Sequence, residues 1–191
     1  MVETAIKKVS PLDGLAGPVG GNVKLTSNGF VGKVIIRGDS DNKDFVTAVK
    51  DVTGVDIPTT ALTFNEGETY SIYWMGPDEW MIMTPEDGEV ALETALREKL
   101  GETPSQVVNV SDYYASMRLS GPAAREVLKK GSPLDLHPSK FKAGNCTGTR
   151  FAHATIFMVQ RDEESTYDIN VRISFAEYLW NYFVEASREF G

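Results

Sequence analysis

Cysteine and histidine are scarce in this chain of 191 residues, which contains one cysteine, Cys146, and two histidines, His137 and His153. A single cysteine excludes an intrachain disulfide, and unpaired thiols are typical of a reducing compartment. A structural zinc site normally takes four cysteine, histidine or carboxylate ligands at short spacings, whereas these two histidines are isolated. We therefore expect a cytoplasmic protein that holds no metal ion.

Basic residues are also in the minority, because 19 Lys and Arg face 27 Asp and Glu, which gives a formal net charge of −8 at pH 7. Nucleic acids and anionic membranes attract positively charged surfaces, so this balance disfavours both as partners. No long apolar run follows the basic pair Lys7-Lys8 or occurs elsewhere. We accordingly expect neither a secretory signal nor a transmembrane helix.

The residue sets of common catalytic sites are missing as well. Cys146 lies within residues 144–148, without a Lys, Arg or His in the two positions on either side to lower its pKa, so a small buried thiol is the simpler interpretation. His153 lies in a predicted strand, which favours an inward or interface histidine over a catalytic one. The neighbouring carboxylates of Asp78 and Glu79 lie on a predicted turn, where such side chains commonly stabilise the turn. We predict no catalytic, cofactor-binding or metal-binding residue.

Residues 1–22 show little periodicity and are rich in glycine and proline toward their end. This predicts an N-terminal arm that lies extended on another surface, with a loose tail as the alternative. Asn28-Gly29 then form a turn pair that favours a hairpin between residues 23–27 and 30–37.

From residue 34 onward, the chain contains the same order of motifs twice. In each copy, a strand closed by glycine precedes a short helix, a prolyl loop, a pair of strands and a closing helix. The opening strands are residues 34–38 (VIIRG) and 117–121 (MRLSG), and the strand pairs are residues 70–74 with 80–83 and 149–160 with 166–173. Each unit is too small to bury its own sheet, so we predict an α+β fold in which two β-α-β-β-α units, residues 23–105 and 106–191, form one body.

Residue types typical of helix ends predict the helix boundaries. Thr84 and Ser174 are the expected N-caps of the two closing helices, since a side-chain oxygen there accepts a hydrogen bond from the first turn. The first short helix is expected to end at Gly54. In the second, Pro122 fits the first turn and Gly131 is expected to end the helix in the left-handed conformation.

Aromatic residues are more numerous than a core of this size needs, with three tryptophans and seven tyrosines. Tyr and Trp are enriched at protein interfaces because a large ring adds contact area at small entropic cost. The last helix has apolar or aromatic residues on more than one face, which is typical of a helix buried on two sides; alternatively, both sides face the protein's own sheets. The candidate subunit-contact residues are Trp74, Trp80, Tyr178, Trp180 and Tyr182.

Three segments together resemble one known family, namely residues 74–85 (WMGPDEWMIMTP), 118–138 (RLSGPAAREVLKKGSPLDLHP) and 174–183 (SFAEYLWNYF). Their order and spacing resemble the gamma subunit of bacterial heterotetrameric sarcosine oxidase, over residues 34–189. The family pattern often has an arginine where this chain has Ile173, so a subunit contact made by that arginine would be altered here. The family pattern has leucine at the positions of Met75 and Met81, and methionine has a similar volume.

The resemblance implies a fold similar to the folate-binding domain of aminomethyltransferases and a non-catalytic role in an assembly of alpha, beta, gamma and delta subunits. That assembly oxidises the N-methyl group of sarcosine and yields glycine, hydrogen peroxide and formaldehyde, or methylenetetrahydrofolate when tetrahydrofolate is supplied. Its FAD, FMN and NAD lie in or between the alpha and beta subunits, and its zinc lies in delta. The resemblance therefore implies that this chain holds no cofactor.

Two alternatives stay open at this point. A stand-alone folate-binding or one-carbon-transfer module of the same fold would place a carboxylate near the pterin. Asp56 and Asp135 are candidates, although each lies in a prolyl loop where a turn-stabilising role is sufficient. A chain that ends at Gly191 is also expected to be too short for the domains that close a folate cavity. The other alternative is a subunit of a related N-methyl amine oxidase, since the flavoprotein partner selects the substrate.

Overall fold

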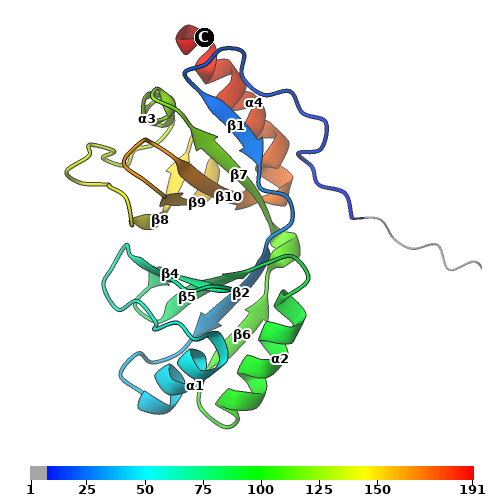
Figure 1. The fold of residues 1–191 in the computed structure, drawn as a ribbon, viewed down its shortest axis with the longest axis vertical. Helices are drawn as coiled ribbons and strands as arrows, with labels where there is room; N and C mark the ends of the chain where they lie inside the picture. Colours follow the sequence, from blue (N-terminus) through cyan, green and yellow to red (C-terminus); the bar gives the residue numbers. More distant parts are fainter. Residues whose placement is uncertain (1–7) are drawn as a thin grey trace, which may run out of the picture.

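Alternating apolar and polar residues form two antiparallel sheets in the computed structural model, which describes residues 8–191 (Figure 1). The strands of one sheet are β2 (Gly32–Arg37), β3 (Phe64–Glu66), β4 (Ser71–Gly76), β5 (Glu79–Thr84) and β6 (Gln106–Asn109). Those of the other are β1 (Lys24–Ser27), β7 (Tyr114–Ser120), β8 (Cys146–Phe151), β9 (Ala154–Gln160) and β10 (Tyr167–Arg172). The strand orders are β3-β4-β5-β2-β6 in the first sheet and β1-β7-β10-β9-β8 in the second.

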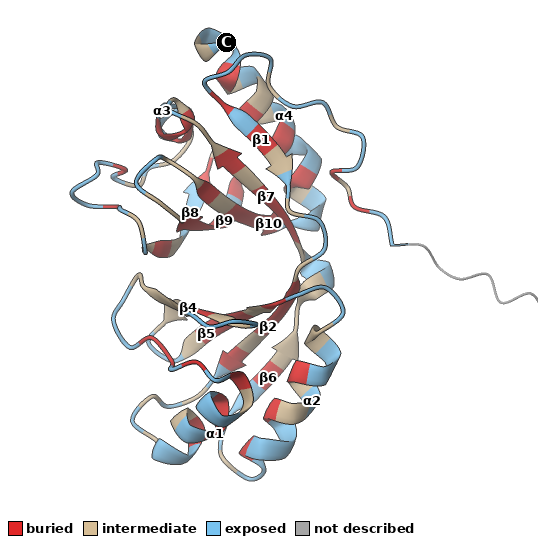
Figure 2. Cartoon of the chain, viewed as in Figure 1, coloured by how far each residue is buried: buried red, intermediate tan, exposed pale blue. Residues whose placement is uncertain are grey.

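Two helices cover the outer face of each sheet, so that the inner faces of the sheets look toward one another (Figure 1). Helices α1 (Lys43–Thr53) and α2 (Glu89–Leu100) pack on the first sheet, and α3 (Ala124–Lys129) and α4 (Ala176–Ser187) pack on the second. Each sheet thereby has its own apolar core, and in Figure 2 the helices are buried on the sheet side and exposed on the other. Among residues 8–191, no helix is long and apolar enough to cross a bilayer.

The two halves repeat one order of elements and exchange their first strands. The run β1-β2-α1-β3-β4-β5-α2 has the same order as β6-β7-α3-β8-β9-β10-α4. β1 runs antiparallel to β7, with Leu25 opposite Leu119, whereas β6 runs antiparallel to β2, with Ile36 opposite Val107. The predicted α+β fold of two related units is confirmed, and the exchange gives each sheet one strand from the other half of the chain.

This exchange corrects one detail of the sequence-based prediction. The hairpin expected at Asn28-Gly29 is wrong, because β1 and β2 belong to different sheets. The turn pair instead directs the chain from one sheet to the other.

The helix caps show where local sequence preference gives way to tertiary pairing. Gly54 ends α1 in the left-handed conformation, with φ of 71°, as predicted. The caps predicted at Thr84 and Ser174 are wrong: Thr84 pairs with Gly32 in the sheet, and Ser174 lies in a 3-10 turn before α4. Neither α2 nor α4 receives a side-chain hydrogen bond at its N-cap.

Two further boundaries are corrected in the second half. Gly131 does not have a positive φ, and α3 ends before it, at Lys129. A Cβ atom at Gly131 would lie 2.7 Å from the Phe151 ring, so close packing requires this glycine. The strand predicted over residues 149–160 is divided by a turn at Ala152, where φ is 48°. His153 is therefore exposed on a turn, and its predicted inward position is wrong.

Most of the described part of the N-terminal arm, residues 8–22, packs on the second half of the chain, and Figure 1 shows it running beside α4. At its start, Lys8 binds Glu86 and Asp87 of the first half. Leu12 is buried in the core of the second sheet. The indole Nε1 of Trp180 donates a hydrogen bond to the carbonyl of Ala16 at 2.8 Å, and the Asn22 amide donates to the carbonyl of Phe190 at 2.7 Å. Residues 1–7 of the predicted arm lie outside the described residues.

Candidate subunit-contact surface

An aromatic row lies on the open side of α4 and consists of Phe175, Tyr178 and Tyr182. The ring centroids of Phe175 and Tyr178 are 6.3 Å apart, and those of Tyr178 and Tyr182 are also 6.3 Å apart. The helix buries Leu179 and Phe183 on its other side. Because a helix has about 3.6 residues per turn, these two residues form an inner apolar stripe and the aromatic row forms an outer one. Tyr178 is 37 % exposed, which leaves the outer stripe available for contact.

The two tryptophans Trp80 and Trp180 lie inside the protein, with exposed fractions of 0 % and 4 %. The Trp80 Nε1 donates to the carbonyl of Pro58 at 2.8 Å, as the Trp180 Nε1 does to Ala16. Because both rings are buried and both indole N–H groups are satisfied, we remove these two residues from the predicted contact set. Trp74 and Tyr182 are each half-buried against the core of their own sheet, and Tyr178 is exposed. Trp74, Tyr178 and Tyr182 therefore stay as the candidates with open ring surface.

Between the sheets, a polar cleft of about 390 Å³ opens to the surface. Arg118 forms a two-point ion pair with Asp168, at 2.7 and 2.9 Å, across β7 and β10. Arg161 binds Glu66 at 2.6 Å and donates to the Tyr73 hydroxyl at 3.2 Å, so it joins the second sheet to the first. Both carboxylates are held in ion pairs, an arrangement that positions the strands around the cleft.

Asn170 lines this cleft from β10 and is fully buried. Among the described residues, neither its Oδ1 nor its Nδ2 has a hydrogen-bond partner. The sequence analysis missed this residue and Arg161. The sequence feature that could have identified Asn170 is the alternation of polar with apolar residues in β7 and β10. The polar residues Ser116, Arg118, Asp168 and Asn170 all fall on the face opposite the helices.

Cys146 is the buried thiol that the sequence analysis favoured. Its Sγ donates to the carbonyl oxygens of Thr63 at 3.2 Å and Trp74 at 3.6 Å, and it lies in the apolar cluster between the sheets. Burial raises the pKa of this thiol to about 12, so it is protonated at neutral pH and is not a nucleophile there.

The remaining polar candidates have local structural roles. Asp56 pairs with Lys50 at 2.8 Å, and Asp135 accepts a hydrogen bond from the backbone N–H of His137 at 3.0 Å. Neither carboxylate lines the polar cleft. Within residues 8–191, no group of three or more His, Cys, Asp or Glu is arranged to hold a metal ion.

Comparisons with known proteins agree with the fold and identify the family. The family model described as "Sarcosine oxidase, gamma subunit family" matches residues 37–189. The sarcosine oxidase subunit gamma of Corynebacterium sp. (strain P-1) is 32 % identical, and the match covers 100 % of this chain and 95 % of that protein.

Solved structures give the same result. A chain of the heterotetrameric sarcosine oxidase from Corynebacterium sp. U-96, solved in complex with pyrrole 2-carboxylate, matches with a TM-score of 0.83 and 29 % identity, covering 91 % of this chain and 88 % of that one. The glycine cleavage system aminomethyltransferase T from Bartonella henselae shares the fold alone, with a TM-score of 0.63 and 14 % identity over 87 % of this chain and 46 % of that one. The chain belongs to the sarcosine oxidase gamma subunit family.

Proposed function

We propose that this chain is the gamma subunit of a heterotetrameric sarcosine oxidase, in which it binds alpha, beta and delta subunits and performs no chemistry itself. The observation that carries the proposal is the similarity to a chain of a heterotetrameric sarcosine oxidase, with a TM-score of 0.83 over 91 % of this chain. The proposal places the protein in the cytoplasm and in one-carbon metabolism. Its role is to hold the assembly together.

In this proposal, the partner subunits oxidise sarcosine to glycine and release hydrogen peroxide with formaldehyde, or methylenetetrahydrofolate. FAD, FMN and NAD belong to the alpha and beta subunits, and zinc belongs to delta. This division is supported by the contacts of the reactive side chains, which are engaged or buried within this chain. The carboxylates of Glu66 and Asp168 bind arginines of the same chain, and the Cys146 thiol is buried.

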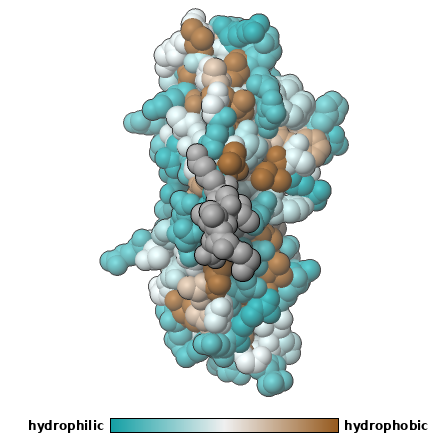
Figure 3. Space-filling view, turned by 90° about the vertical axis from the view of Figure 1, so that its right-hand side faces the viewer, coloured by the Kyte–Doolittle hydropathy of each residue, from teal (hydrophilic) through white to brown (hydrophobic). Residues whose placement is uncertain are grey.

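The open aromatic row supports a contact role for α4. Phenol rings bury large apolar area at small entropic cost and keep a hydroxyl for a hydrogen bond at the rim of an interface. On the face shown in Figure 3, apolar residues form separate patches among hydrophilic ones.

Co-expression tests the proposal. A tagged form of this chain, produced together with the flavoprotein subunits of the same organism, should elute with them in size-exclusion chromatography. The double variant Tyr178→Ser/Tyr182→Ser should weaken this association by about tenfold, because it removes two rings from the contact. Val90→Ser is the matched control, since Val90 is 62 % exposed on α2 and lies outside the aromatic row. Elution of the chain alone, with full oxidase activity in the remaining subunits, contradicts the proposal.

A folate-binding or one-carbon-transfer module is the second candidate, and the polar cleft favours it. Asn170 presents an unpaired amide donor and acceptor to a space of about 390 Å³ between two arginine ion pairs. This function predicts saturable fluorescence quenching when the purified chain is titrated with tetrahydrofolate, and loss of that signal in Asn170→Leu. A flat titration of the correctly folded chain rules this candidate out.

A further inference from the structure

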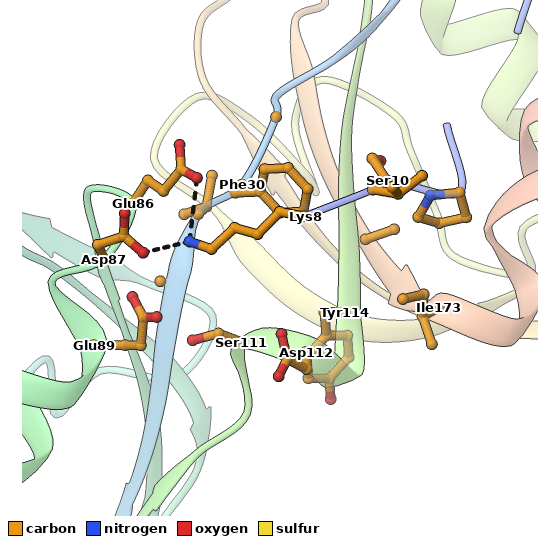
Figure 4. Close-up of a pocket in the computed structure, with 16 residues that line it drawn as sticks. Lys8, Ser10, Phe30, Glu86, Asp87, Glu89, Ser111, Asp112, Tyr114 and Ile173 are labelled. Atoms are coloured by element: carbon orange, nitrogen blue, oxygen red, sulfur yellow. Dashed lines mark hydrogen bonds and ion pairs between the residues drawn. The ribbon is translucent and has the colours of Figure 1, made fainter. Parts of the chain in front are cut away.

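A second concave feature, which we call the acidic pocket, lies where the arm, β2 and α2 meet (Figure 4). It has a volume of about 190 Å³. Phe30, Tyr114 and Ile173 contribute apolar wall, while Glu89 and Asp112 contribute carboxylates. Phe30 and Ile173 are 39 % and 47 % exposed, so the pocket wall keeps apolar surface that residues 8–191 do not cover.

The rim of the acidic pocket already holds one cation. The Lys8 Nζ binds Glu86 at 3.2 Å and also binds Asp87, as the dashed lines in Figure 4 show. The same ammonium lies 5.7 Å from the centroid of the Phe30 ring. A lysine stem against an apolar ring, with its charge on carboxylates, is therefore a ligand that this pocket accepts.

The Lys8 contacts occupy Glu86 and Asp87 but not the other two carboxylates. Among residues 8–191, no Lys or Arg forms an ion pair with Glu89 or Asp112, and the buried Oε2 of Glu89 has no hydrogen-bond partner. The nearby Lys33 is 1 % exposed, and its Nζ donates to the carbonyl of Val31 at 3.0 Å. The charges of Lys33 and Glu89 attract each other, but the two side chains form no direct ion pair. A carboxylate oxygen shielded from water without a donor is costly, so binding a donor there is favourable.

The acidic pocket adjoins the aromatic row. Ile173, which forms part of its wall, belongs to the 3-10 turn Ile173–Phe175, and Phe175 begins the row. A partner that covers Tyr178 can therefore extend a side chain toward the pocket. Apolar walls and unpaired carboxylates together suit a long side chain that ends in a positive charge.

We propose that the acidic pocket receives one arginine or lysine side chain of another subunit, which packs its aliphatic stem against Phe30 and Ile173 and brings its charge to Glu89 and Asp112. The inference deepens the proposed function and rests on it. The pocket then contributes to the choice and orientation of the partner, because a buried charge pair penalises any subunit that lacks the cation.

The experiment measures the affinity of the full chain for the other subunits, co-expressed without it, at low and at high salt. The double variant Glu89→Gln/Asp112→Asn should lower affinity at low salt by about tenfold or more and flatten the salt dependence, since it removes the charge and keeps the shape. The control Glu98→Gln/Glu102→Gln removes two exposed charges at the other end of α2 and should leave both unchanged. Thermal melts verify that all variants fold.

The outcomes separate the two proposals. If the unaltered chain binds and the pocket variant matches it in affinity and salt dependence, the pocket proposal is overturned and the gamma-subunit proposal stands. If the unaltered chain does not bind the other subunits, both fail. Equal weakening by the pocket variant and the control assigns the effect to net charge and also overturns the pocket proposal.

Discussion

Lys33 and Cys146 are among the ionisable side chains that the fold buries, at 1 % and 0 % exposure. Burial lowers the pKa of Lys33 to about 8 and raises that of Cys146 to about 12, because it disfavours the charged form of each. The negative charge of Glu89 acts in the opposite sense on Lys33 and keeps its pKa from falling further. Burial of the charged Lys33 side chain therefore lowers the free energy of unfolding near neutral pH.

Replacement of Lys33 by methionine should stabilise the protein. The ordinary pKa of 10.5 applies in the unfolded chain and about 8 in the folded one. As pH falls from 10.5 to 8 the unfolded state therefore gains the proton first, and the free energy of unfolding decreases. Lys33→Met should remove this slope and raise the free energy of unfolding at pH 7 by about 1–3 kcal/mol. Urea unfolding across this range measures it, with exposed Lys24→Met as control; identical curves for both variants contradict the expectation.

At the scale of elements, two indoles fix segments that come from distant parts of the sequence. Trp180 of α4 holds the arm through Ala16, and Trp80 of β5 holds the loop at Pro58, each through a hydrogen bond of 2.8 Å. The sequence analysis named both rings as candidates for a partner interface because nothing adjacent in sequence shows which carbonyl accepts their N–H groups. Burial of these rings depends on chain segments that only the tertiary fold brings close.

Trp180→Phe should release the arm without unfolding the sheets. Loss of the indole hydrogen bond and of part of the ring contact should accelerate amide hydrogen exchange in residues 10–15, whose N–H groups are hydrogen-bonded within the arm, by about tenfold. Trp80→Phe is the matched control, because it removes an equivalent bond and should accelerate exchange near residues 55–58 only. The expectation is wrong if the arm exchanges equally fast in both variants.

Local pattern predicted those elements whose determinants are local. The glycine end of α1 at Gly54 and the pairing of β4 with β5 follow from residues close in sequence. The exchange of β1 and β6 does not, because Leu25 and Val107 fit an apolar strand position in either sheet. Likewise, Thr84 has the chemistry of a cap but continues β5, since its backbone pairs with Gly32. Tyr178 was a candidate contact residue from the sequence and is exposed in the structure, whereas Arg161 and Asn170 could be noticed only once the two sheets were placed face to face.

At the scale of the whole molecule, Arg161 is a side-chain connection between the sheets, beside the backbone bridge between Thr63 and Asn145. Its guanidinium binds Glu66, donates to the Tyr73 hydroxyl and lies 5.4 Å from the centroid of the Phe64 ring. The apolar cluster around Cys146 and Phe157 lies between the same two sheets. Together they fix the relative orientation of the two cores, and with it the position of the acidic pocket relative to the aromatic row.

Arg161→Gln should lower the free energy of unfolding by about 1–2 kcal/mol, since it breaks a partly buried ion pair and the hydrogen bond to Tyr73. Arg188→Gln is the control. Arg188 forms an ion pair with Glu185 in which its own side chain is 74 % exposed, so this change should stay within about 0.5 kcal/mol. Urea unfolding of both variants makes the comparison. An equal effect of the two substitutions contradicts a role for Arg161 in joining the sheets.

The most direct test of a docking role is hydroxyl-radical footprinting of this chain, first alone and then together with the other oxidase subunits. Phe175, Tyr178 and Tyr182 should be oxidised in the isolated chain and protected in the assembly, while fully buried Trp80 should be unreactive in both. Equal oxidation of the aromatic row in the two samples, with the subunits demonstrably associated, would contradict the account.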